Sequence, residues 1–222
     1  GRAVPLFRKL REPVNGLTHL GAALLALPGV ALLLFLSQGD LAKQLTLLLY
    51  GLGLVLMFSS SATYHLVQST PKIMLRLRKF DHSAIYLMIA GTYTPICYHY
   101  LSSAWRWGLL ATIWVLAIAG IGIKLFVIKA PRWVTAGIYL VMGWLAIIAI
   151  QEILRQMPPA AIGWLLAGGI FFTLGAIIYI TKWPNLLPKV FGFHEIWHIF
   201  VILGGLSHFI MIAAYIARPA SG

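Results

Sequence analysis

The sequence predicts an all-α integral membrane protein, a bundle of seven transmembrane helices, from three observations. Of the 222 residues, 60% are hydrophobic and only 10% are charged, whereas soluble domains carry about 25% charged residues. Long apolar stretches recur along the whole chain between short breaks that contain charges or prolines. The charged residues are mostly basic and gather in alternate breaks, which is the distribution expected when every second loop faces the cytoplasm.

The first half of the chain contains three predicted spans, each close to the 20 or so apolar residues that a membrane crossing needs. The first, 16–37, follows a basic N-terminal arm and ends before Asp40. The second, 42–67, and the third, 81–101, lie on either side of a segment with four basic residues. We therefore expect short polar connections between these three helices.

The second half of the chain contains four more spans with equally short connections. The fourth and fifth, 105–128 and 131–153, are separated by a basic break, and so are the sixth and seventh, 160–182 and 190–216. No connection is long enough to form a second domain. The sequence therefore predicts a single membrane domain over the whole chain.

The basic residues orient the predicted bundle. Four of the 17 Lys and Arg residues fall on one side, namely Lys43, Arg106, Arg155 and Arg218. The other 13 fall in the N-terminal arm or in the second, fourth and sixth connections: Arg2, Arg8, Lys9, Arg11, Lys72, Arg76, Arg78, Lys79, Lys124, Lys129, Arg132, Lys182 and Lys189. Because basic loops stay in the cytoplasm, we expect a cytoplasmic arm at 1–15 and a C-terminus outside.

Charge and cysteine content exclude several classes of function. The net charge of +12 could indicate nucleic-acid binding, but the basic residues flank apolar spans instead of forming one stripe. Topology signalling and attraction to anionic head groups explain them better. The single Cys97 excludes an intrachain disulfide and a cysteine-based metal motif. Membrane lipids are thus the expected partners; nucleic acid is not, no particular protein is indicated, and the oligomeric state stays open.

Three histidines are candidate metal ligands. His194 and His198 are four residues apart, so they share one helix face about one turn apart. His65, near the end of the second span, is predicted to lie at the same depth and to add a third imidazole. Three protein ligands leave a position for water, as in catalytic zinc sites, although iron, cobalt and nickel also accept imidazole. Alternatively, each histidine packs against a helix and hydrogen-bonds a carbonyl, which is the better explanation for a lone histidine but not for this group.

Asp81 and Ser61 are candidate catalytic residues. Asp81 opens the third span at the predicted depth of the histidines, where an ionisable side chain is costly and indicates a functional site. It could accept a proton from metal-bound water, orient a ligand or coordinate the ion; alternatively, it pairs with Arg78 or Lys79. Ser61 precedes His65 by one turn and could stabilise a developing oxyanion, or it could bond the carbonyl four residues before it.

Glu12, Asn15 and His19 follow a spacing of three and then four residues, so they share a face at the start of the first span. We expect them to support the metal ligands or to contact substrate. Two alternatives stay open: a polar contact between helices, and for Glu12 a helix-start position favoured by the helix dipole.

These motifs resemble those of the hemolysin III family, the bacterial branch of the progestin and adipoQ receptor group, which is similar to alkaline ceramidases. The matching segments follow the family's order over nearly the whole chain: Glu12-x2-Asn15-x3-His19, Ser61-x3-His65, Phe80-Asp81-His82-Ser83 running to Gly91-Thr92-Tyr93-Thr94-Pro95, and His194-x3-His198 running to Ser207-His208-Phe209.

The resemblance implies a seven-helix fold with a cytoplasmic N-terminus in the bacterial inner membrane. It also implies one zinc ion held by His65, His194 and His198. In the wider group, the positions of Ser61 and Asp81 are associated with a zinc-bound water and with hydrolysis of lipid amides. Bacterial members are linked to membrane fluidity and energy homeostasis.

Three functions follow as hypotheses. The first is a metal-dependent hydrolase of a lipid amide or ester at the cytoplasmic leaflet. The second is a non-enzymatic membrane-homeostasis or sensing protein whose zinc is structural. The third, pore formation, is the least favoured because the spans are evenly apolar and lack a charged ring or polar stripe that could line a channel.

Overall fold

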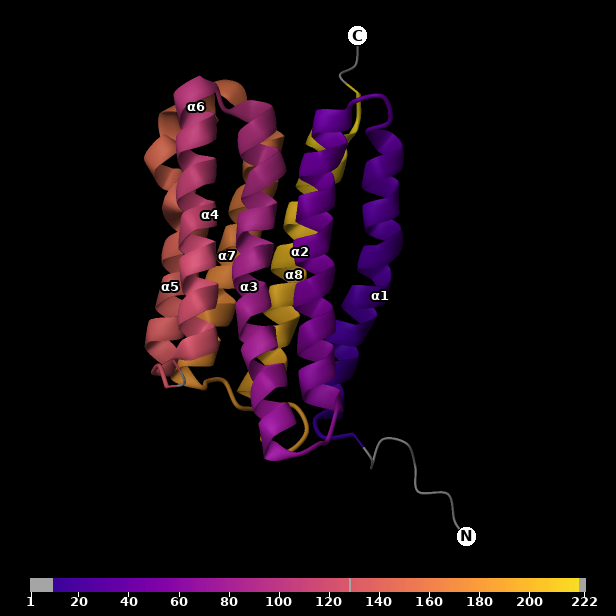
Figure 1. The fold of residues 1–222 in the computed structure, drawn as a ribbon, viewed down its shortest axis with the longest axis vertical. Coiled ribbons are helices and arrows are strands. Elements are labelled where there is room, and N and C mark those ends of the chain that lie inside the picture. The colour runs from indigo at the N-terminus through magenta and orange to yellow at the C-terminus, as the bar shows by residue number, and fades with distance from the viewer. Residues whose placement is uncertain (1–9, 128, 220–222) are drawn as a thin grey trace.

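The apolar stretches form long helices that lie side by side (Figure 1). The structure, a computed structural model, describes residues 10–127 and 129–219, and this part of the chain contains no strand. Part of the predicted N-terminal arm, with Arg2, Arg8 and Lys9, lies outside the described residues. The elements are α1 (Pro13–Leu36), α2 (Leu41–Leu66), α3 (Pro71–Tyr100), α4 (Ser103–Phe126), α5 (Arg132–Trp144), the 3-10 helix η2 (Leu145–Ala149), α6 (Ile150–Gln156), α7 (Pro159–Thr181), α8 (Phe193–Ile212) and the π-helix η3 (Ala213–Ala217).

Six helical segments are long and apolar enough to cross a membrane, which makes the chain a multi-pass membrane protein: α1, α2, α4, the continuous run from α5 to α6, α7, and α8 with η3. The helix α3 is not among them. It begins at Pro71, ten residues before the predicted third span, and its first turns carry four basic residues. The count of seven spans and the cytoplasmic N-terminus therefore stay predictions.

The early start of α3 corrects the expectation that its basic residues lie in a loop. The Thr70 hydroxyl accepts a hydrogen bond from the Ile73 N–H at 3.4 Å, and Pro71 occupies the first helical position. Both features begin helices, and Lys and Arg are good helix formers. The predicted span begins only after the basic residues, because charge marks its boundary. The helix itself includes these residues.

The two ends of the bundle differ in charge. Figure 1 shows that α1 begins and η3 ends at opposite ends of the bundle. The connections from α2 to α3, α4 to α5 and α7 to α8 lie at the end where α1 begins (Figure 1), together with the basic residues of these connections and of the adjoining helix ends. We call this the basic end, and the opposite one the far end.

Close packing of α2 against α3 depends on two glycines. A Cβ atom added to Gly53 would lie 2.7 Å from the carbonyl oxygen of Leu87, and one added to Gly91 would lie 2.9 Å from that of Leu49. Small residues let membrane helices approach this closely. The two contacts hold α2, which carries His65, directly against α3.

The fifth predicted span is not one regular helix, because α5 ends at Trp144 and η2 follows. The Tyr93 hydroxyl of α3 donates to the Met142 carbonyl at 2.7 Å and accepts from the Ala146 N–H at 3.0 Å. Backbone groups freed by a break need partners inside a bilayer, and Tyr93 supplies them. No proline marks the break, so the sequence alone does not predict it.

Candidate metal centre

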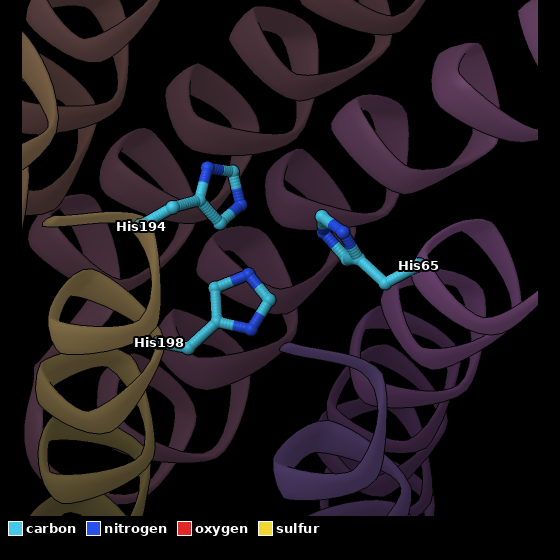
Figure 2. A group of neighbouring side chains, drawn as sticks. All are labelled: His65, His194 and His198. Carbon is cyan, nitrogen blue, oxygen red and sulfur yellow. The ribbon is translucent and has the colours of Figure 1, made fainter. Parts of the chain in front are cut away.

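Three histidines meet near the basic end of the bundle. His65 is the next-to-last residue of α2, while His194 and His198 lie in the first turns of α8. One potential ligand atom of each lies within 4.8 Å of the others, and Figure 2 shows the three rings clustered between the two helices. The predicted gathering of the three imidazoles is confirmed, and the group could hold a metal ion.

The hydrogen bonds of two rings leave the right nitrogens for a metal. His65 Nδ1 bonds the carboxylate of Glu12, and His198 Nδ1 lies 3.1 Å from the Asn15 carbonyl oxygen, to which it can donate. A metal-binding histidine usually donates its other N–H to such a partner, so Nε2 of each ring is left as a ligand. Nε2 of His194 is buried and has no hydrogen-bond partner among the described residues. The donor set therefore fits a divalent ion that accepts imidazole.

Glu12 brings negative charge to this group. Its carboxylate bonds His65 and accepts from Arg11 Nη1 at 2.8 Å. Burial raises the pKa of the carboxyl, but the hydrogen bond with His65 and the charge of Arg11 outweigh burial and hold that pKa below its ordinary value. Glu12 precedes α1, yet its side chain makes no capping hydrogen bond. Its observed partner is the candidate ligand His65, and its supporting role stays a prediction.

Asn15 links α1 to α8 through Glu195, a residue for which the sequence alone predicted no role at the site. Its amide nitrogen donates to Glu195 Oε1 at 3.0 Å, and Glu195 Oε2 accepts from the Gly192 N–H at 2.8 Å. Glu195 is the third residue of α8, a position where Glu often bonds the backbone before the helix. This position at the start of a helix is the sequence feature from which the role of Glu195 could have been predicted. The link holds the Asn15 carbonyl against His198.

His19 and Ser61 form a buried pair beside the ligands. His19 Nδ1 and Ser61 Oγ share a hydrogen bond of 2.7 Å, so the serine hydroxyl has a side-chain partner. The His19 ring stacks on the His198 ring with centroids 3.7 Å apart and planes 8° apart. His19 Nε2 is buried without a hydrogen-bond partner among the described residues. His19 thus supports His198 by stacking, while a substrate contact stays a prediction.

Asp81 lies in α3 with only 8% of its surface exposed. It forms no ion pair with Arg78 or Lys79 within the described residues, and the Lys79 ammonium instead donates to the Leu125 carbonyl at 2.7 Å. The competing interpretation of Asp81 as half of a surface ion pair is therefore not observed. Its role as a base stays a prediction.

An apolar cavity of about 330 Å³ extends from Asp81 along the bundle. His19, Ser61, Asp81 and His198 line it near the basic end. It follows α3 as far as Leu101, and 20 residues of helix correspond to about 30 Å. Most of the other lining side chains are aliphatic or aromatic. The cavity is therefore long, narrow and suited to a hydrocarbon chain.

A second basin of about 520 Å³, more polar than the cavity and therefore called the polar basin, also borders the histidines. His65 and His194 line this basin, whereas His198 lines the apolar cavity. The remaining lining residues include Arg11, Glu12, Asn15, Tyr64, Asn185, Lys189 and Glu195. The three-histidine group thus separates a polar space at the basic end from an apolar space inside the bundle.

Comparison with known proteins agrees with these features. A family profile described as "Haemolysin-III related" matches residues 7–209. Hemolysin-3 of Bacillus cereus is 36% identical over 95% of this chain and 94% of its own, and the Hemolysin-3 homolog of Bacillus subtilis (strain 168) is 33% identical over 96% and 98%. The human monocyte to macrophage differentiation factor is 29% identical over 92% of this chain and 84% of its own. This helical membrane protein, with its three-histidine group between α2 and α8, belongs to the haemolysin III family.

Proposed function

We propose that this protein is a zinc-dependent hydrolase that cleaves an amide or ester bond of a membrane lipid at the cytoplasmic leaflet. The observation that carries the proposal is the position of the histidines between a polar basin and a long apolar cavity. A lipid chain in the cavity would place its head near His198, Ser61 and Asp81. Water would reach the same point from the basin.

The residues around this point have complementary roles in such a reaction. Zinc held by His65, His194 and His198 would polarise the scissile carbonyl and lower the pKa of water towards about 7. Asp81 takes a proton from the attacking water and returns it to the leaving amine or alcohol. The Ser61 hydroxyl donates a hydrogen bond to the oxyanion that forms on the carbonyl oxygen. The products are a carboxylic acid and the released head-group amine or alcohol.

The test combines metal analysis with a hydrolysis screen. We expect detergent-purified wild type to contain about one zinc per chain and to release fatty acid from at least one member of a panel of lipid amides and esters. Chelation should abolish release, and zinc should restore it. Asp81→Asn should keep the zinc and lose turnover. A folded, zinc-loaded wild type that is inert towards the whole panel would contradict the proposal.

One observation favours a second candidate, a structural ion in a membrane-homeostasis or sensing protein. The backbones of α2 and α8 make few close approaches, whereas each packs against α1 and α3, so an ion between His65 and the α8 histidines would add a direct link between two helices that otherwise meet mainly through their neighbours. On this hypothesis Asp81→Asn leaves the cellular phenotype intact. Replacing His65 with Ala instead lowers thermal stability as strongly as chelation does.

A further inference from the structure

A lysine at the basic end contacts the wall of the apolar cavity. Lys124 lies in the last turn of α4, and its ammonium donates to the Thr135 hydroxyl of α5 at 3.0 Å. Thr135 is 4% exposed and lines the apolar cavity. A lysine that only signals topology needs to reach the head-group layer, not a buried hydroxyl. Lys124 therefore brings positive charge to the wall of the cavity.

The hydroxyl of Thr135 is arranged differently from most helical threonines of this chain. In the usual arrangement, the hydroxyl donates to the carbonyl four residues earlier, as seen for Thr18, Thr63, Thr92, Thr94, Thr112, Thr173 and Thr181. Thr135 instead accepts from Lys124. A hydroxyl that accepts from a cation keeps its own proton to donate. That proton can reach an acceptor in the cavity.

A second cation lies at the same end of the cavity. Arg132 donates through Nη1 to the Tyr179 carbonyl at 3.2 Å, and its guanidinium lies 4.7 Å from the centre of the Tyr179 ring. Tyr179 also lines the cavity, and its ring centre is 6.3 Å from that of His194. The positive charge is therefore one aromatic ring away from the candidate metal centre.

Neither cation is neutralised by an acidic side chain. Among the described residues, which include all five Asp and Glu, the only carboxylate in a salt bridge is that of Glu12. Lys124 at the Thr135 hydroxyl and Arg132 at Tyr179 thus supply two positive charges without an acidic partner. Both side chains are partly buried at the cavity end, and partly buried charges gain from a partner of opposite sign, which an anionic group of a ligand would supply.

We propose that the basic end of the apolar cavity holds a binding site for the anionic head group, such as a phosphate, of an amphiphilic ligand. Lys124 and Thr135 bind the anion, and Arg132 adds a second positive charge. The inference rests on the proposed function only in identifying this ligand with the lipid substrate. It narrows that substrate class to lipids with an anionic head group, whose reactive carbonyl lies between the head group and the chain in the cavity.

The test compares two probes that share a tail: a pyrene-labelled dodecyl phosphate and the matching alcohol. Wild type in nanodiscs of zwitterionic lipid is kept in chelator, so that no anion can bind through a metal. Energy transfer from tryptophan reports binding, because Trp144 and Trp197 line the cavity. We expect the phosphate to bind at least about tenfold more tightly than the alcohol, a difference typical of charge-assisted hydrogen bonds.

Variants assign this preference to the site. Lys124→Gln should lose most of the preference without changing alcohol binding, Lys124→Arg should keep it, and Thr135→Val should reduce it severalfold. The exposed Lys72 provides the matched control, and Lys72→Gln should behave as wild type. Unchanged alcohol binding also shows that each variant is folded.

Three results would overturn the site. They are equal binding of the two probes, a preference that Lys124→Gln leaves intact, and a preference that appears only when zinc is added. If inorganic phosphate at equal concentration displaces the phosphate probe, the site binds anions without contribution from the hydrocarbon tail. That result would refute the proposal that the ligand is an amphiphile. If the alcohol and the phosphate bind equally well, the proposed head-group site is refuted, but the apolar cavity as a lipid-binding site is not. If the phosphate probe binds more tightly than the alcohol but no lipid of the panel is cleaved, the proposed hydrolase activity is refuted and the head-group site is supported.

Discussion

Replacing Glu12 with Gln tests whether this carboxylate orients the candidate ligand His65. The change keeps the size of the side chain and removes its charge. The charge supports two contacts, one with His65 Nδ1 and one with Arg11 at 2.8 Å. A hydrogen bond to a charged group contributes about 1.5–3 kcal/mol and a neutral one about 0.5–1.5 kcal/mol, so about 1–1.5 kcal/mol is at stake.

The side chain of Glu12 is 37% exposed, and solvent weakens such interactions, so the lower part of this range applies. We therefore expect zinc affinity to fall about fivefold, just below the 10- to 100-fold loss typical when such a partner is removed. Glu12→Ala, which leaves both partners unpaired, should lie closer to the high end.

The measurement is a competition titration of purified protein against a zinc-binding dye at fixed pH. Asp40→Asn serves as the control, because Asp40 caps α2 at the far end and should not alter zinc affinity. Zinc binding by Glu12→Gln within twofold of wild type would refute the reasoning. It would mean that packing alone fixes the His65 ring.

Three further outcomes are expected. His194→Ala should reduce zinc from about one ion per chain to near zero by plasma mass spectrometry; full retention would exclude the three-histidine site. Ser61→Ala should keep the zinc and lower turnover on a cleaved lipid about 100-fold, the loss typical of an oxyanion donor, and an unchanged turnover would remove that role. Gly53→Ala should destabilise the protein by about 1–3 kcal/mol in thermal unfolding, because the added Cβ would meet the Leu87 carbonyl. Gly122→Ala, where nothing lies within 4 Å, is its neutral control.

Much of the fold follows from apolar length alone. The first two predicted spans, 16–37 and 42–67, differ from α1 and α2 by at most three residues at either end, because a bilayer fixes how long an apolar helix must be. The start of α3 at Pro71 could not be found in this way, since a helix can continue into the basic head-group layer. The break after Trp144 depends on the Tyr93 hydroxyl from another helix, which is tertiary information.

The candidate site likewise contains features that local sequence predicts and features that depend on packing between helices. The pair His194 and His198 is local, because helical periodicity alone places both side chains on one face. The partners of the ring nitrogens are not local: Glu12 and the Asn15 carbonyl reach the ligands only because α1 packs beside α2 and α8. Sequence spacing indicated that these residues share a face, but not which atom meets which ring. The contact of Lys124 with Thr135 likewise depends on how α4 is placed relative to α5.

The surroundings of the histidines also bear on whether an ion there would be catalytic or structural. A structural zinc site is closed by four protein ligands, whereas a catalytic site keeps a position open. Among the described residues the group offers three imidazoles, and spaces of opposite character lie against it. His198 faces the apolar cavity, and His65 and His194 face the basin. An ion needed only to join α2 and α8 would require neither space, so the open surroundings favour chemistry at the boundary between water and lipid chain.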